Sequence, residues 1–149
     1  MTASQEKKPR IVLIDDHPKA LMAASQIMKD EFEIVATVGN SEAGLDAVSM
    51  LKPDIVIIDI GMPGENGFET ARRMKEYFCT TRIVFLTVTE DVEYACAARD
   101  MGGSYVVKRR LRTDLMTAAR EAMRGNLFFS PILPPSLGPF SSSMPDRTS

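Results

Sequence analysis

The segment VIIDIGMPGENG, residues 56–67, places an apolar run directly before Asp59 and a glycine-rich stretch directly after it. Similar short apolar runs recur along the chain, and most are β-branched and continuous rather than alternating. Such runs are typical of strands buried on both faces of a sheet. The predicted strands are residues 11–14, 34–38, 55–58, 83–86 and 105–107. Asp59 therefore lies where a buried strand meets a loop.

The segments between these strands have helical spacing and recognisable ends. Ser41 is suited to capping the second helix, and Asn66 with Glu69 resembles a capping box at the start of the third. Gly102 and Gly125 are expected to end the fourth and fifth helices. Regular alternation of strand and helix predicts a parallel sheet with right-handed crossovers and helices on both faces. We therefore predict one doubly wound α/β domain.

Composition excludes several other classes of protein. The chain has 149 residues, of which 44% are hydrophobic and 26% charged, and a formal net charge of −2, so no global basic field attracts nucleic acid. No apolar run is long enough to span a membrane, and the N-terminus lacks the apolar core of a signal peptide. Cys79 and Cys96 lack metal-ligand spacing and are expected to be reduced thiols of a cytoplasmic protein. The single histidine, His17, argues against a site built from several imidazoles.

The two ends of the chain differ from its middle. Residues 1–9 are expected to be a flexible N-terminus. Residues 126–149 contain five prolines and six serines and are expected to be a linker or tail, largely disordered toward its end. The start of this tail, FFSPIL, is apolar and suited to packing back on the domain.

Polar side chains follow four of the five predicted strands. They are Asp15 and Asp16, Asp59, Thr87 and Lys108. A single acid after a strand is commonly a solvated turn or a helix cap. However, the carboxyl ends of parallel strands meet at one edge, where ligands bind in open α/β sheets. Three carboxylates predict a divalent cation with oxygen ligands, such as Mg²⁺, and the hydroxyl and ammonium groups predict binding of a transferring phosphoryl group. A carboxylate placed there is a plausible nucleophile that gives an aspartyl phosphate.

These motifs together resemble the receiver domain of bacterial two-component response regulators. The matching stretches are IVLIDDHP, PDIVIIDIGMPGENGFE, IVFLTVTED and GGSYVVK, in that order. The resemblance covers about residues 10–125 and implies a flavodoxin-like (βα)₅ fold with strand order 2-1-3-4-5. It implies that a sensor histidine kinase phosphorylates Asp59 with Mg²⁺ as cofactor. The implied Mg²⁺ ligands are Asp15, Asp16, Asp59 and the backbone carbonyl of Gly61, and the implied phosphoryl contacts are Thr87 and Lys108.

Two further features have alternative interpretations. Tyr105 is either a half-buried strand aromatic or, as the resemblance implies, a switch residue that turns inward when Thr87 moves toward the phosphate. The basic run 108–110, with Arg112 nearby, is either a solvated loop or a surface for an acidic partner or for self-association. Many receivers have proline directly after the lysine, where this chain has Arg109.

The output is less defined than the receiver. The motif details and an SP-x-L stretch resemble the subfamily in which a helix-turn-helix DNA-binding domain follows the receiver. The 24 residues after Gly125 leave no room for such a domain, so direct nucleic-acid binding by this chain is not expected, and either a naturally short chain or a fragment of a longer regulator fits. Expected partners are a histidine kinase, a second copy through the face of the fourth helix, fifth strand and fifth helix, or a downstream protein effector. We expect a signalling switch linked to transcription regulation, not an enzyme beyond its own phosphoryl transfer and dephosphorylation.

Three alternatives belong to other classes. A degenerate receiver would act as an interaction module without phosphorylation. A small α/β phosphatase would need a second acid at the position of Gly61, two residues after the nucleophile. A nucleotide binder of the same fold would need a phosphate-binding loop after the first strand, where Asp15 and Asp16 repel phosphate unless a metal intervenes.

Overall fold

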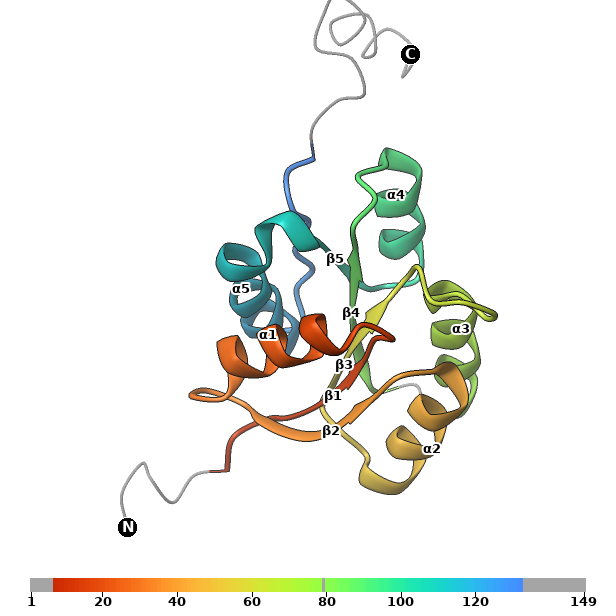
Figure 1. The fold of residues 1–149 in the computed structure, drawn as a ribbon, viewed down its shortest axis with the longest axis vertical. Coiled ribbons are helices and arrows are strands. Elements are labelled where there is room, and N and C mark those ends of the chain that lie inside the picture. The colour runs from red at the N-terminus through yellow and green to blue at the C-terminus, as the bar shows by residue number, and fades with distance from the viewer. Residues whose placement is uncertain (1–6, 79, 133–149) are drawn as a thin grey trace, which may run out of the picture.

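The computed structural model describes residues 7–78 and 80–132. Its five parallel strands form one sheet in the predicted order, β2-β1-β3-β4-β5 (Figure 1). The strands are β1 (Arg10–Ile14), β2 (Glu33–Val38), β3 (Ile55–Asp59), β4 (Arg82–Thr87) and β5 (Ser104–Val107). The helices are α1 (Pro18–Met28), α2 (Ser41–Leu51), α3 (Gly67–Tyr77), α4 (Val92–Asp100) and α5 (Leu111–Met123), with a 3₁₀ turn η2 (Lys108–Arg110) before the last.

The sheet lies between two layers of helices, as the doubly wound fold requires. Helices α1 and α5 cover one face, and α2, α3 and α4 cover the other (Figure 1). In β3, Ile55 and Ile57 pack toward the α1–α5 layer, whereas Val56 and Ile58 pack toward the opposite layer. Both faces of the central strands are therefore buried, which explains their continuous apolar runs. The expectation of full burial is wrong for β2, because β2 is an edge strand and most of its residues are half-buried.

The helix ends follow local chemistry, with one correction. The capping box of Asn66 and Glu69 is present at the start of α3, as predicted. The cap of α2 is Asn40, whose side-chain oxygen accepts from the Ala43 amide at 2.8 Å, so the prediction that Ser41 caps this helix is wrong. Ser41 is the first helical residue, and its hydroxyl is bound to Thr70 Oγ1 on α3. Asn40, the residue before Ser41, has the extended backbone that a cap requires.

The glycines expected to end two helices do so. Gly102 and Gly125 follow the caps of α4 and α5 with φ values of +76° and +84°. This left-handed conformation is accessible to glycine without the steric penalty of a side chain. None of the described helices has the length and apolar content needed to cross a membrane.

Residues 127–132, which we name the C-terminal strap, return to the domain after α5. Phe129 forms a parallel bridge with Tyr105 of β5, and Phe128 and Phe129 pack against opposite layers of the core. The apolar start of the tail thus contacts the domain. The predicted flexible N-terminus covers residues 1–9 and the predicted tail covers residues 126–149. Of these, residues 1–6 and 133–149 lie outside the described residues, as does Cys79.

Candidate functional site

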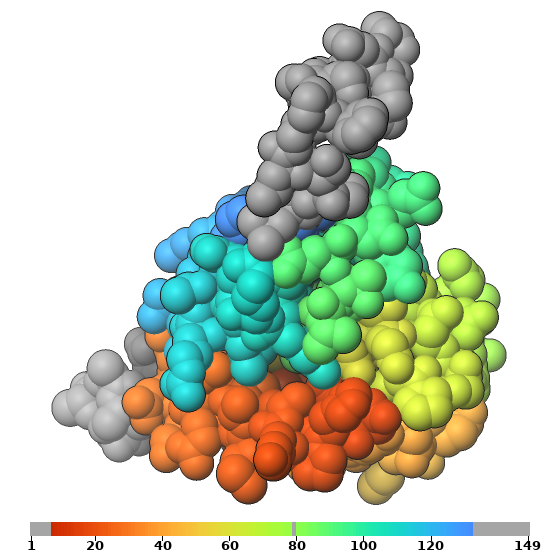
Figure 2. All heavy atoms as spheres, turned by 45° about the horizontal axis from the view of Figure 1, so that its top comes forward, coloured from red at the N-terminus to blue at the C-terminus, as the bar shows by residue number. Residues whose placement is uncertain are grey.

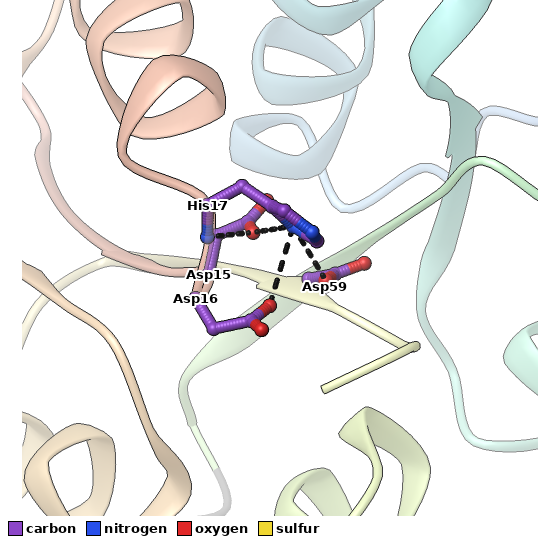
Figure 3. Close-up of side chains that lie close together, drawn as sticks. All are labelled: Asp15, Asp16, His17 and Asp59. Atoms are coloured by element: carbon purple, nitrogen blue, oxygen red, sulfur yellow. Dashed lines mark hydrogen bonds and ion pairs between the residues drawn. The ribbon is translucent and has the colours of Figure 1, made fainter. Parts of the chain in front are cut away.

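Carboxylates from two adjacent strands meet at the carboxyl edge of the sheet. β1 pairs directly with β3, so that Ile14 lies beside Ile58 and the residues that follow them are brought together. Asp15, Asp16, His17 and Asp59 each offer a ligand atom, and these atoms all lie within 4.8 Å of one another (Figure 3). This end of the molecule is formed by segments far apart in the sequence: α1, the β4–α4 region and the η2–α5 region (Figure 2).

Lys108 brings a positive charge to this acidic cluster. Its Nζ lies 2.7 Å from Asp15 Oδ2 and 3.6 Å from Asp59 Oδ1. The Lys108 side chain is 13% exposed, and those of the two aspartates are 3% and 4% exposed. Because solvent screens buried charges poorly, the ammonium group attracts both carboxylates more strongly than it would at the protein surface. The sequence prediction that Asp15, Asp59 and Lys108 converge is confirmed by these distances.

The environment of Asp59 disfavours its ionised form. Burial raises the pKa of Asp59, and the nearby charge of Asp15 raises it further. Lys108 and the hydrogen bond from the Gly61 amide to Asp59 Oδ1, at 3.3 Å, oppose this rise. The net effect is a raised pKa, because burial and the like charges of Asp15 and Asp16 outweigh Lys108 and the Gly61 amide.

The donor set fits a hard divalent cation. Asp16 Oδ1 is buried and accepts no hydrogen bond from the described part of the chain, and its nearest basic group is His17 Nδ1 at 3.3 Å. Buried carboxylate oxygens are normally paired, so this atom is suited to an additional cationic partner. The neighbouring oxygens belong to Asp15 and Asp59, and Mg²⁺ prefers such carboxylate ligands. Gly61, the fourth predicted ligand, is exposed in the loop directly after β3.

His17 was not predicted to belong to this cluster. Its Nδ1 lies 3.0 Å from Asp15 Oδ1, 3.3 Å from Asp16 Oδ1 and 3.9 Å from Asp59 Oδ2 (Figure 3). The only sequence signal was its position directly after the two acids. The His17 side chain is 62% exposed, so it lies on the solvent side of the cluster.

Gly67 is a second residue whose importance the sequence did not indicate. A Cβ atom on Gly67 would lie 2.5 Å from the backbone oxygen of Asp59 and 2.8 Å from the Cα of Ile60. At Gly61, by contrast, the nearest atom would be 4.0 Å away. The position that requires a residue without a Cβ atom is therefore Gly67, at the start of α3, where the helix packs against the backbone of Asp59.

Thr87 and Tyr105 are joined through one residue of the loop that follows β4. Thr87 Oγ1 accepts a hydrogen bond from the Thr89 amide at 3.0 Å, and Tyr105 donates its hydroxyl proton to the Thr89 carbonyl at 2.8 Å. The Asp91 amide also donates to the Tyr105 hydroxyl, at 3.3 Å. Tyr105 is 0% exposed, so the interpretation as a half-buried aromatic is wrong. Burial raises the pKa of its hydroxyl.

Thr87 lies at the same edge of the sheet as Asp59. In the pairing of β3 with β4, Asp59 lies opposite Leu86, so Thr87 is one residue beyond that level. Its side chain is buried. The predicted placement of a hydroxyl beside the acidic cluster is consistent with this register.

The basic run after β5 forms ion pairs within the domain. Arg109 makes a bidentate pair with Glu90, at 2.6 and 2.9 Å, and Arg110 makes one with Asp114, at 2.7 and 3.2 Å. Both guanidinium groups are therefore held by acids of the same domain, and Arg109 is also exposed to solvent. Arg112 is exposed.

A comparison with known proteins identifies the family. The profile of the response regulator receiver domain matches residues 11–120. The chain belongs to the response regulator receiver domain family. This finding confirms the resemblance inferred from the strand-end motifs, and receiver domains are signalling switches rather than conventional enzymes.

Relatives of this receiver are transcriptional response regulators. It is 32% identical over 137 residues to the nitrate/nitrite response regulator protein NarL of Escherichia coli K12, a match that covers 90% of this chain and 63% of NarL. It is 30% identical over 135 residues to the DNA-binding transcriptional activator EvgA of the same organism, covering 89% of this chain and 64% of EvgA. The chain thus spans less than two thirds of the length of these relatives.

A solved structure shares the receiver fold. A two-component response regulator of the LuxR family from Aurantimonas superposes with a TM-score of 0.78 at 25% identity, covering 84% of this chain and 91% of that one. The fold and the family are therefore shown by independent comparisons.

Proposed function

We propose that this receiver accepts a phosphoryl group on Asp59 in a Mg²⁺-dependent reaction. The observation that carries the proposal is the buried convergence of Asp59 with Asp15, Asp16 and Lys108. A structural ion pair would need one acid for one lysine, whereas this site surrounds a single ammonium group with an excess of carboxylates. That excess suits a site that also binds a cation and a phosphoryl group.

Each residue has a defined role in the proposed transfer. An oxygen of the ionised Asp59 carboxylate attacks phosphorus and forms the new O–P bond, while the bond from phosphorus to the donor histidine nitrogen, or to the oxygen of a small phosphodonor, breaks with its electron pair. Asp15, Asp16, Asp59 and the Gly61 carbonyl would hold Mg²⁺. When bound, Mg²⁺ supplies positive charge that offsets the charge of the acids and of the phosphoryl oxygens.

Lys108 and Thr87 would stabilise the transferred group. Lys108 Nζ is already 3.6 Å from Asp59 Oδ1, so a small shift away from Asp15 brings it to a phosphoryl oxygen on Asp59. The Thr87 hydroxyl accepts from the Thr89 amide, and it keeps its own proton for donation to a second phosphoryl oxygen. Positioning and charge stabilisation are the main contributions a receiver of this kind makes.

The signal would pass from Thr87 to Tyr105 through Thr89. Because Thr89 is bound to both side chains, movement of Thr87 toward the phosphate changes the position of the loop that holds the Tyr105 hydroxyl. A local electrostatic change would thereby shift the populations of the conformations that the surface of α4, β5 and α5 adopts. A second copy or a downstream effector would bind that surface.

The remaining partners are proposed on the same basis. A sensor histidine kinase in the cytoplasm would supply the phosphoryl group. EvgA is a DNA-binding transcriptional activator, and we propose that this receiver likewise acts in transcription regulation.

Mass spectrometry of the intact protein tests the proposal. After incubation with acetyl phosphate, we expect the wild-type protein to gain one phosphoryl group only when Mg²⁺ is present. Asp59→Asn should abolish this gain, whereas Asp100→Asn, the same change at an exposed acid of α4, should leave it intact. No gain from acetyl phosphate or from any candidate kinase, with the protein folded, would instead support the interaction module that acts without phosphorylation.

A further inference from the structure

The edge strand β5 is covered by the C-terminal strap. β5 has only β4 as a strand neighbour within the sheet, yet all four of its residues are buried. The Tyr105 amide donates to the Phe128 carbonyl at 2.9 Å, and the Ser130 amide donates to the Tyr105 carbonyl at 2.8 Å. Both main-chain groups of Tyr105 are therefore paired with the strap, which satisfies an edge that would otherwise be open.

Ser130 anchors the strap in a buried polar site. Its hydroxyl donates to Asp114 Oδ2 at 2.7 Å and accepts from the Val107 amide at 3.2 Å. Ser130 is 5% exposed and Asp114 is 3% exposed. Because a buried carboxylate is costly without donors, the pair between Asp114 and Arg110 together with the Ser130 hydroxyl forms a specific docking position. A second anchor is the Phe128 amide, which donates to Ser104 Oγ at 3.0 Å.

Apolar side chains of the strap pack against the core cluster to which Tyr105 belongs. Phe129 and Ile132 pack against the core cluster that contains Tyr105 and Val107. With the strap in place, Tyr105 has no exposed surface, and its hydroxyl is directed to Thr89 and Asp91. A turn of the ring away from the core would break the hydrogen bonds of its hydroxyl with Thr89 and Asp91.

One 3₁₀ turn connects the strap to the acidic site. The three consecutive residues of η2 pair with four acids: Lys108 with Asp15 and Asp59, Arg109 with Glu90, and Arg110 with Asp114. Arg109 Nη2 also lies 3.4 Å from the Pro131 carbonyl of the strap. Displacement of Lys108 therefore moves the residues that hold both the β4–α4 region and the strap.

We propose that the β5 edge is a docking surface whose ligand is the chain's own strap, and that docking favours the buried state of Tyr105. The strap is attached to α5 by a short connection, so its effective concentration at β5 is high. This half of the proposal needs no phosphorylation. The second half rests on the proposed function: because the buried state of Tyr105 is also the state expected after Asp59 is phosphorylated, strap docking and phosphoryl binding strengthen each other. The strap then transmits the state of the receiver to whatever follows residue 132.

The docking half is tested by hydrogen exchange and NMR without any phosphoryl mimic. We compare Phe129→Ser with Leu127→Ser, which makes the same kind of change at a strap residue that is 41% exposed. We expect the amides of Tyr105 and Ser130 to exchange at least about tenfold faster in Phe129→Ser, and the Tyr105 ring signal to move, with neither change in Leu127→Ser. Ser130→Ala is a milder variant that keeps the backbone pairing, and it replaces Phe129→Ser if that protein does not fold. We expect the same two amides to exchange faster in Ser130→Ala than in the wild-type protein. Rapid exchange of these amides in the wild-type protein would overturn the docking.

The coupling half is tested by titrating the same proteins with beryllofluoride, a phosphoryl mimic, in the presence of Mg²⁺. We expect Phe129→Ser and Ser130→Ala to bind it about fivefold or more weakly than the wild-type and Leu127→Ser proteins. Equal affinities, with the exchange difference present, would overturn the coupling and leave the docking supported. Failure of every protein to bind beryllofluoride would refute the proposed function and the coupling with it, and the exchange result would still decide the docking.

Discussion

Replacing Gly67 by alanine tests how closely α3 must approach the phosphoacceptor strand. Alanine is the better helix former, by up to about 1 kcal/mol relative to glycine, so propensity alone predicts a more stable protein. The new Cβ would, however, lie 2.5 Å from the Asp59 oxygen and 2.8 Å from the Ile60 Cα. Both contacts are to backbone, which cannot rotate away.

The steric contact should outweigh the gain in helix propensity. Overpacking of this kind costs about 1–3 kcal/mol, and Gly67 is the first residue of α3, where propensity contributes least. We therefore expect the free energy of unfolding to fall by about 1–2 kcal/mol and Tm to fall by about 3–8 °C. The shift in the Asp59 backbone should also slow phosphorylation by acetyl phosphate.

Gly44→Ala is the matched control, because Gly44 lies inside α2 and its new Cβ would meet the Cδ1 atom of Ile14, the far end of a side chain. The Ile14 side chain has to shift, but the new Cβ meets no backbone atom there, so the free energy of unfolding should fall by less than in Gly67→Ala. Urea unfolding and thermal melts of the two variants provide the comparison. Should Gly67→Ala prove as stable as Gly44→Ala and be phosphorylated at the wild-type rate, the close approach has no consequence and our reasoning is refuted.

Three further changes have expected outcomes. Tyr105→Phe removes the hydroxyl that is bound to Thr89, and it should lower the free energy of unfolding by about 1–2 kcal/mol in urea titrations. Lys108→Met leaves the acids without their ammonium group, so Mg²⁺ should bind several-fold more tightly in a fluorescence or calorimetric titration, while phosphorylation of Asp59 slows at least about a hundredfold. Asp114→Asn should flatten the acid limb of the curve of stability against pH, measured by urea unfolding between pH 7 and pH 2.

The sign of the Asp114 effect follows from its pKa. Burial raises the pKa of Asp114, but hydrogen bonds from Arg110, Ser130 and Thr113 outweigh burial and lower it below the ordinary value. A carboxyl group with a lower pKa in the folded state stabilises the protein above its unfolded pKa and loses that contribution as pH falls through the folded pKa. An acid limb that is equally steep in Asp114→Asn would contradict this assignment.

Tyr105→Phe and Lys108→Met each have a result that would contradict the expectation. Unchanged stability of Tyr105→Phe would mean that the hydroxyl bond to the loop is absent in solution. Weaker Mg²⁺ binding by Lys108→Met would mean that the lysine supports the cation site instead of competing with it.

Local patterns in the sequence were sufficient to predict the architecture and the location of the site. Continuous β-branched runs identify the central strands because burial on both faces acts on every residue of such a strand. Asp59 and Thr87 could be placed at one edge because parallel strands share a direction, which is a property of the topology and needs no side-chain detail. The capping box of Asn66 and Glu69 was readable because both partners lie within one helical turn.

Pairings between distant residues were decided only by the tertiary structure. No local pattern indicates that Ser130 would meet Asp114, that Arg109 would meet Glu90, or that Gly67 would lie against Asp59. Each of these contacts depends on which segments the folded sheet and its helices bring together, and on distances of tenths of an ångström that periodicity does not encode. The sequence by itself therefore determined the fold, the family and the acidic site, whereas the strap on β5 and the close contact behind Asp59 were determined by packing, which acts on the whole chain at once.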